Sequence, residues 1–135
     1  MLLLSVVRQE SLFEGFATSY AAARGLMQVI PDTGQSIADQ VGWPVGYQAA
    51  DLYRPVVSVR FGAFYLSEQR GRFEGDLYAG LAAYNAGPGN AILWKELAPD
   101  DPDLFLEIIR LDQPQLYIKT IYEVYAIYRR LYETS

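Results

Sequence analysis

The sequence predicts an all-α protein, and three features of the 135-residue chain indicate this fold class. Apolar side chains recur at the three- and four-residue intervals that place them on one face of an α-helix. No stretch alternates apolar and polar residues in the manner of a half-buried strand. Prolines and glycines stand between successive apolar segments, where such residues begin or end helices. We therefore expect a single globular domain of about seven helices.

Three helices are expected in the first half of the chain. Residues 2–13 form a short apolar helix that Gly15 closes. The second helix begins at Asp32, because Asp32 followed three residues later by Gln35 resembles a capping box. After a loop, Pro55 suits the first turn of a longer helix. The sequence "RGRFEGD" ends this third helix.

Four further helices are expected in the second half. Residues 77–84 carry apolar side chains at helical spacing, and "NAGPGN" interrupts them. The next helix starts at Pro88 or Gly89. Asp103 is the expected N-cap of a short helix, and the last helix covers residues 114–132. One stripe of this last helix comprises Tyr117, Ile121, Val124, Tyr125, Tyr128 and Tyr132.

The charge and composition exclude several classes of protein. The net charge is −5, whereas a surface that binds nucleic acid needs an excess of Lys and Arg. With half of its residues apolar and 20% charged, the chain has the composition of a globular protein and not of a disordered tail. We expect no nucleic-acid partner and no membrane span in this chain.

Missing residue types narrow the possible chemistry further. The chain contains no His and no Cys, which excludes a Ser-His-Asp triad, a Cys nucleophile and a zinc site built on thiolate or imidazole. Glycine-rich phosphate-binding or dinucleotide-binding motifs are also missing. We expect no cofactor and no metal. Any acid–base catalysis then falls to carboxylates, tyrosines or lysines.

The N-terminal segment "MLLLSVV" could pass for the core of a signal peptide, but it has no basic region before it and runs directly into "RQES". We interpret it as the first helix of the domain. Because this helix starts abruptly at Met1, we expect residues 1–135 to be a fragment or C-terminal part of a longer protein.

Glu10 is the best candidate for a catalytic acid. Its neighbours on the helical face are apolar, and burial favours the protonated form of a carboxyl group. Alternatively, Glu10 pairs with Arg8 or Arg24 at a helix end, and helix periodicity alone favours this second interpretation. Glu14 is a rival acid, although the adjacent Gly15 indicates an exposed helix end.

Two uncharged segments could contact a neutral ligand. In "GLMQ", the amide of Gln28 can donate and accept hydrogen bonds, as N-acetyl groups and sugar hydroxyls require. In "AAYNAGPGN", Tyr84 and Asn85 stand at a helix end beside two glycines. Each segment also has a purely structural interpretation, in which Gln28 satisfies backbone groups and the glycines end one helix before the next. Taken singly, each segment favours its structural interpretation.

Four segments in order, "RQES", "GLMQVIP", "AAYNAGPG" and "YIKTIYEVYAIY", resemble the catalytic domain of soluble lytic transglycosylases. These enzymes belong to glycoside hydrolase family 23 and have the goose-type lysozyme fold. The resemblance covers nearly the whole chain. It implies cleavage of the β-1,4 bond between N-acetylmuramic acid and N-acetylglucosamine in peptidoglycan, with formation of a 1,6-anhydromuramoyl end. It further implies that one glutamate is both acid and base, and that the substrate's own N-acetyl group and hydroxyl replace the usual second carboxylate.

The resemblance also implies roles for individual residues. Glu10 becomes the general acid and base. Residues expected to contact the substrate or line its cleft are Ser19, Gln28, Tyr84, Asn85, Gln113 and Tyr117. Two positions depart from the family pattern. Gln113 stands where many members have a glutamate, so that Asp112 is a candidate substitute, and Ala22 stands where glycine is frequent.

Three functions are considered, of which the first is the leading hypothesis and the other two are alternatives. The first is a lytic transglycosylase, the second a muramidase that hydrolyses the same bond with water, and the third a glycan-binding module that has lost catalysis. A second carboxylate in the cleft would favour the muramidase, and Glu14 and Asp112 are the candidates for it. The expected partner is the glycan strand of peptidoglycan. The expected location is the periplasm or cell envelope, reached through an export signal outside this chain.

Overall fold

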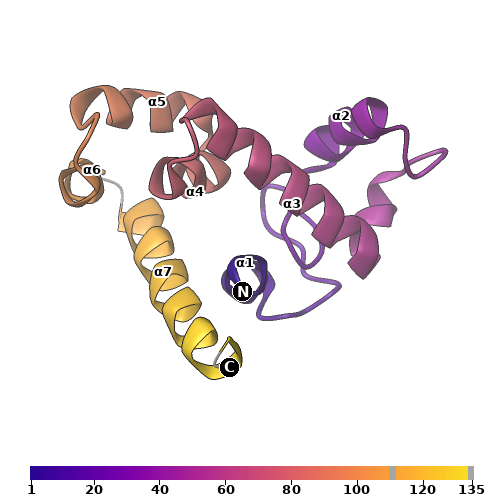
Figure 1. Ribbon diagram of the computed structural model, residues 1–135. Helices are drawn as coiled ribbons and strands as arrows, with labels where there is room; N and C mark the ends of the chain where they lie inside the picture. Colours follow the sequence, from indigo (N-terminus) through magenta and orange to yellow (C-terminus); the bar gives the residue numbers. More distant parts are fainter. Residues whose placement is uncertain (110–111, 134–135) are drawn as a thin grey trace.

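A computed structural model describes residues 1–109 and 112–133, and within them the fold consists of α-helices and one 3₁₀ helix without β-strands. Seven α-helices confirm the predicted all-α class. The elements are α1 (Leu2–Ser11), α2 (Pro31–Val41), η1 (Ala49–Tyr53), α3 (Pro55–Arg72), α4 (Leu77–Ala86), α5 (Pro88–Leu97), α6 (Pro102–Ile108) and α7 (Asp112–Tyr132) (Figure 1).

Helix α3 is the long central element of the fold. Figure 1 shows it running across the molecule, with α4 and α5 near one end and α2 near the other. Helix α4 packs against α3, α5 and α7, and α7 packs against α1. The core is formed by fully buried apolar side chains from all these elements, among them Val6, Met27, Ile37, Phe61, Leu81, Ile118 and Ile121. The first and last α-helices are therefore neighbours in space.

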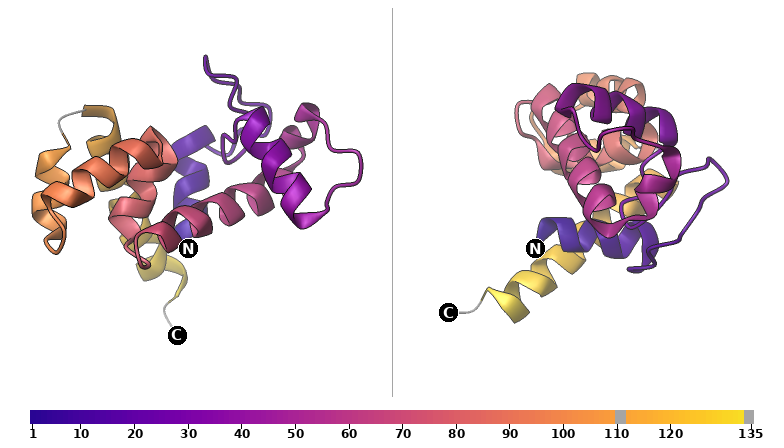
Figure 2. Two further views of the ribbon diagram at one scale, coloured as in Figure 1. Left: turned by 90° about the horizontal axis from the view of Figure 1, so that it is seen from above. Right: turned by 90° about the vertical axis from the view of Figure 1, so that its right-hand side faces the viewer.

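The two ends of the chain lie on the same side of the molecule, as all three views show (Figures 1 and 2). The N-terminal ammonium group lies 4.0 Å from a carboxylate oxygen of Glu133. This arrangement follows from the packing of α1 against α7. It brings residues near position 10 close to residues near position 117.

Prolines begin helices where the sequence predicts them, but two predicted caps are wrong. Pro55 and Pro88 are the first residues of α3 and α5. Helix α2 begins at Pro31, whose fixed φ already suits a helix, and it has no side-chain cap. The capping box at Asp32 is therefore absent, and the side chain of Gln35 donates to Asp39 instead.

The other wrong cap is that of α6. Its N-cap is Asp101, whose carboxylate accepts hydrogen bonds from the backbone N–H groups of Asp103 and Leu104, both at 3.0 Å. Pro102 again takes the first helical position, which places the cap one residue before it. Helix α1 also ends earlier than predicted, because Leu12 adopts a left-handed conformation (φ 51°) well before Gly15.

Candidate active site

Glu10 lies in the last turn of α1 and is held from the other end of the chain. The phenolic hydroxyl of Tyr117, in α7, donates a hydrogen bond to Oε1 of Glu10 at 2.5 Å. These residues are 107 positions apart in the sequence, and they meet because α1 packs against α7. The described residues include no ion pair to Glu10, so the interpretation that it pairs with Arg8 or Arg24 is not supported.

The environment of Glu10 favours its protonated form. Burial raises the pKa of Glu10 from its ordinary 4.5 to about 7, because desolvation penalises the carboxylate. The hydrogen bond from Tyr117 favours the carboxylate and so lowers this pKa, but burial is the larger effect. Near neutral pH the group is therefore poised between acid and base, as a residue that first donates and later accepts a proton must be.

Two tyrosines lie near this carboxyl, Tyr117, which is buried, and Tyr84, which is partly buried. Burial and the negative charge of Glu10 raise the pKa of Tyr117 and of Tyr84 well above the usual value. Both hydroxyls therefore stay protonated at neutral pH and can act as hydrogen-bond donors. Tyr84 donates to the backbone carbonyl of Met27 at 2.7 Å, and its ring packs against Tyr65 with a centroid distance of 5.3 Å.

The "GLMQ" segment is fixed by hydrogen bonds from two helices and by close packing. The hydroxyl of Ser11 donates to the carbonyl of Leu26 at 3.0 Å, and the hydroxyl of Ser58 accepts from the N–H of Met27 at 3.0 Å. Gly25 has φ +76°, and a Cβ atom there would lie 1.9 Å from the carbonyl oxygen of Leu52. Only glycine fits such a close approach.

Gln28 has a structural function in this loop. Its side-chain nitrogen donates to the carbonyls of Ala17, at 3.1 Å, and of Gly25, at 3.0 Å. These two bonds agree with the structural interpretation given above, in which Gln28 satisfies backbone groups. Its side-chain oxygen has no partner among the described residues and remains available as an acceptor.

The residues before this segment form a small hairpin. The N–H of Ala22 donates to the carbonyl of Ser19, and the N–H of Ser19 donates to the carbonyl of Ala23, both at 3.0 Å. Ala22 adopts a left-handed conformation (φ 59°), as the third residue of such loops does. Glycine adopts this conformation without the strain that the Cβ atom of Ala22 imposes.

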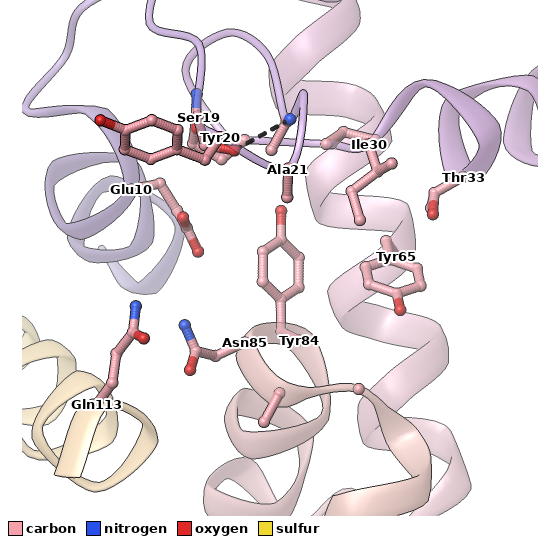
Figure 3. A pocket seen from close by; sticks show the side chains of 15 residues that line it. Glu10, Ser19, Tyr20, Ala21, Ile30, Thr33, Tyr65, Tyr84, Asn85 and Gln113 are labelled. Carbon is pink, nitrogen blue, oxygen red and sulfur yellow. Dashed lines mark hydrogen bonds between the residues drawn. The ribbon is translucent and has the colours of Figure 1, made fainter. Parts of the chain in front are cut away.

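A pocket of about 700 Å³ joins these elements (Figure 3). Six of the predicted site residues line it: Glu10, Ser19, Gln28, Tyr84, Asn85 and Gln113. Tyr117 does not line the pocket and instead contacts Glu10 from behind. The structure thus brings together residues from α1, the hairpin, α4 and α7.

Glu10 is the sole carboxylate among the described residues that line this pocket. Glu14 is exposed and does not line it. The side chain of Asp112 lies outside the described part of the chain. No group of three or more acidic residues in the described ranges is arranged to hold a metal ion.

Nine further residues line this pocket, and the three of them with polar side chains, which sequence reasoning missed, are Tyr20, Thr33 and Tyr65. Tyr20 directly follows the predicted Ser19, so the motif itself pointed to the right loop. Thr33 and Tyr65 come from α2 and α3, and no spacing in the sequence connects either of them with Tyr84. Within the described residues, no helix is both long and apolar enough to cross a bilayer.

Comparison with known proteins identifies the family of this chain. Residues 1–104 match the family model "Transglycosylase SLT domain". The soluble lytic murein transglycosylase of Escherichia coli (strain K12) is 29% identical over 128 residues, and a membrane-bound lytic murein transglycosylase C of Actinobacillus succinogenes is 35% identical over 122 residues. These matches cover 93% and 84% of this chain, but 20% and 33% of the relatives.

The fold has a close counterpart among solved structures. The crystal structure of the 70 kDa soluble lytic transglycosylase from Escherichia coli superposes with a TM-score of 0.89 and 28% sequence identity. The match covers 96% of this chain and 21% of that one, so the chain spans about a fifth of that protein. With the family model covering more than half of its residues, the chain belongs to the transglycosylase SLT domain family.

Proposed function

We propose that this domain is a peptidoglycan lytic transglycosylase that uses Glu10 as its single general acid and base. The observation that supports this function best is one carboxyl with a pKa near 7 in a pocket whose described lining contains no second carboxylate. A glycosidase that uses two carboxylates places one on each side of the scissile bond. A single carboxyl instead suits a reaction in which the substrate itself supplies the nucleophile, so that no second carboxylate is needed.

In the first step, protonated Glu10 donates its proton to the glycosidic oxygen between N-acetylmuramic acid and N-acetylglucosamine. The bond from C1 to this oxygen breaks, and the carbonyl oxygen of the substrate's N-acetyl group stabilises the positive charge that develops at C1. The leaving sugar departs with a free hydroxyl. Glu10 is now a carboxylate, and the hydrogen bond from Tyr117 stabilises this charged form.

In the second step, the carboxylate of Glu10 accepts the proton of the C6 hydroxyl of the muramoyl residue. The C6 oxygen attacks C1 and closes the 1,6-anhydro ring, and Glu10 returns to its protonated form. No water is consumed. A pKa near the working pH allows the same group to perform both transfers.

Other pocket residues position the sugar. The amides of Asn85 and Gln113 and the hydroxyl of Ser19 line the pocket and can hydrogen-bond to N-acetyl and hydroxyl groups. Tyr84 and Gln28 act mainly by fixing the "GLMQ" loop, since each donates to a backbone carbonyl near it. An amide at Gln113 keeps hydrogen-bonding capacity without adding a second negative charge next to Glu10.

The three candidate functions predict different outcomes with purified bacterial sacculi. A lytic transglycosylase releases muropeptides with anhydro ends, a muramidase creates new reducing ends, and an inactive glycan-binding module leaves the strands intact while binding them. Mass spectrometry of the released fragments separates the three. We expect anhydro-muropeptides, and their absence would contradict the proposal.

Glu10→Gln tests the assignment of the acid. We expect its turnover of sacculi to fall by ~10²-fold or more, because glutamine cannot donate the proton. Glu14→Gln is the matched control, since it removes the same charge from an exposed position outside the pocket. Near-normal turnover by Glu10→Gln would remove Glu10 from the mechanism.

The proposed substrate also determines the proposed location. Peptidoglycan lies in the bacterial envelope, and we propose that the domain acts there, on glycan strands. The longer relatives named above are called soluble in one case and membrane-bound in another. The export or anchoring of a longer protein that contains this domain would depend on segments outside residues 1–135.

A further inference from the structure

Tyr20 is an aromatic residue whose position no structural contact explains. Its relative exposure is 113%, and among the described residues it has no hydrogen-bond, aromatic or cation–π partner. It nevertheless lines the same pocket as Glu10. An aromatic ring that stays in water contributes little to folding, and its place in the lining of the pocket makes a ligand bound there the candidate to cover it.

The backbone presents this ring at a fixed place. Tyr20 is the first residue of the three-residue hairpin loop, whose two closing hydrogen bonds between Ser19, Ala22 and Ala23 are each 3.0 Å long. The hydroxyl of Ser19 accepts a third bond from the N–H of Ala23 at 3.1 Å. A platform for a ligand must be held in this way, because an unrestrained loop would lose entropy on binding.

The position of Tyr20 differs from that of the other aromatic residues in the pocket. In the view of Figure 3, Tyr20 lies above Glu10 and Gln113 below it, all three to the left of Tyr84, whereas Tyr65 and Thr33 lie to the right of Tyr84. Glu10 therefore lies nearer to the end that carries Tyr20. A glycan strand laid along the pocket with its scissile bond at Glu10 would contact Tyr84, Ile30, Thr33 and Tyr65 on one side of that bond, and chiefly Tyr20 and Gln113 on the other.

We propose that Tyr20 is the aromatic platform for the sugar unit on the side of the scissile bond away from Tyr65, and that it determines where along a strand the domain cuts. A hexosamine ring has an apolar face of C–H groups that packs on an aromatic ring, while its hydroxyls remain in water. The amide of Gln113, at the same end of the pocket, offers hydrogen bonds to the same sugar unit. This inference rests on the proposed function, since it takes the pocket to be a glycan cleft.

Exposure alone does not distinguish Tyr20, because Phe16 is also an exposed aromatic residue. It belongs to the same loop region and is 81% exposed, but its ring packs on Tyr53 at a centroid distance of 5.9 Å and it does not line the pocket. The two residues are thus alike in hydrophobic exposure and differ in their relation to Glu10. Phe16→Ala is therefore the matched control for Tyr20→Ala.

Binding is measured first, in a Glu10→Gln background that cannot cut. A chitin tetrasaccharide is titrated into this protein and into versions that also carry Tyr20→Ala, Tyr20→Trp or Phe16→Ala, with NMR or calorimetry as the readout. Loss of one aromatic–sugar contact should weaken binding by about five- to tenfold in Tyr20→Ala. Tyr20→Trp should retain the affinity because it keeps a flat ring, and Phe16→Ala should bind like the parent.

Product lengths are measured next, in proteins that keep Glu10. With glycan oligosaccharides of defined length, Tyr20→Ala should shift the distribution of fragment lengths, and Phe16→Ala should not. Unchanged affinity and unchanged fragment lengths in Tyr20→Ala would overturn the inference. So would an equal loss in Phe16→Ala, because the effect would then belong to the loop and not to the ring.

Failure of the proposed function gives a different pattern. If the parent protein leaves sacculi uncut but Tyr20→Ala still weakens binding of the tetrasaccharide, the catalytic proposal fails while the platform stands. If the parent cuts and Tyr20→Ala is indistinguishable from it, the platform fails while the catalytic proposal stands. Thermal melts accompany each variant, and we expect them to match the parent because the replaced ring is exposed.

Discussion

At the scale of single residues, Tyr117 and burial act on the protonation of Glu10 in opposite directions. Burial raises the pKa of Glu10 to about 7, whereas the hydroxyl of Tyr117 lowers it by donating to Oε1. The balance sets the pH at which the carboxyl can begin the reaction as an acid. We expect kcat/KM to decrease as the pH rises through about 7 and Glu10 loses its proton.

Tyr117→Phe removes the hydrogen bond that favours the carboxylate. The pKa of Glu10 should then rise further, so the alkaline decrease in kcat/KM should move to higher pH. The measurement is a pH–rate profile on soluble glycan fragments. Tyr125→Phe, on the same helix and not in contact with Glu10, is the control. A shift of the Tyr117→Phe profile to lower pH would contradict the assigned effect of the hydroxyl.

The same raised pKa has a consequence for stability. A carboxyl with a pKa of about 7 in the folded protein and an ordinary value of 4.5 binds more protons when folded than when unfolded between these two values. The free energy of unfolding therefore decreases as the pH rises from about 4.5 to about 7. Glu10 lowers stability at neutral pH in return for its chemistry.

Glu10→Gln should reverse this loss. At pH 8 we expect its free energy of unfolding to exceed that of the parent by about 1–2 kcal/mol, a figure reduced because the side chain is not fully buried. At pH 4, where the parent carboxyl is protonated in both states, the two proteins should be equally stable. Urea denaturation at both pH values tests this. A constant difference at both pH values would mean that titration of Glu10 is not the cause.

At the scale of elements, the "GLMQ" segment depends on a close approach to α3. A Cβ atom at Gly62 would lie 2.4 Å from the Cβ atom of Met27, which is itself fully buried. Glycine at this position lets the segment lie directly on the helix. Met27 also accepts the hydrogen bond of Tyr84 through its carbonyl, so this contact supports the pocket.

Gly62→Ala should therefore destabilise the protein by about 1–3 kcal/mol, because a methyl group has no space there. Gly71→Ala, in the last turn of the same helix, is the control, since no atom lies within 4 Å of its would-be Cβ. There we expect stabilisation by up to about 1 kcal/mol from the better helix propensity of alanine. Urea denaturation curves of both variants, read against the parent, measure the two effects. Equal effects of the two substitutions would show that the contact with Met27 is not limiting.

Helix positions were predictable because they depend on local pattern, whereas several helix ends were not. Pro55 and Pro88 begin helices as any proline at a first turn does, and periodicity located the segments between. The caps at Asp32 and Asp103 were wrong because Pro31 and Pro102 took the first helical positions instead. The 3₁₀ helix at residues 49–53 was not expected, since so short an element has no periodicity to detect.

The candidate site was predictable only through the order of four motifs. Periodicity by itself favoured an ion pair for Glu10, because burial by a helix that lies more than a hundred residues away leaves no local signal. The same holds for Tyr65, which reaches the pocket by its packing on Tyr84. Tyr20 was not predicted because a single exposed aromatic residue in a loop belongs to no periodic sequence pattern.

At the scale of the whole molecule, α7 completes the fold as well as the site. It supplies Tyr117, Ile118 and Ile121 to the core, each at most 4% exposed. Burying each such side chain stabilises a protein by roughly 1.5–3 kcal/mol, and their sum is comparable to the whole stability of a small domain. The family model matches residues 1–104, which do not include this helix.

A chain that ends at Ile109 should therefore fail to fold cooperatively, although it contains the whole matched segment. The measurements are near-ultraviolet circular dichroism, which reports fixed aromatic packing, and thermal melting. A chain that ends at Glu133 retains all of α7 and should behave like the parent. A sharp thermal transition in the shorter chain would contradict this role of α7.

The hydrogen bond between the two ends of the chain also has a consequence in time. During synthesis, Glu10 leaves the ribosome early, and Tyr117 follows 107 residues later. At about 5–20 residues per second this delay is roughly 5–20 s. A nascent chain therefore carries the acid without the helix that buries it, so the proposed cutting activity stays latent until α7 has been synthesised and has folded onto α1. A proteolytic cut before Tyr117 would remove the helix that buries Glu10 and should return the domain to that latent state.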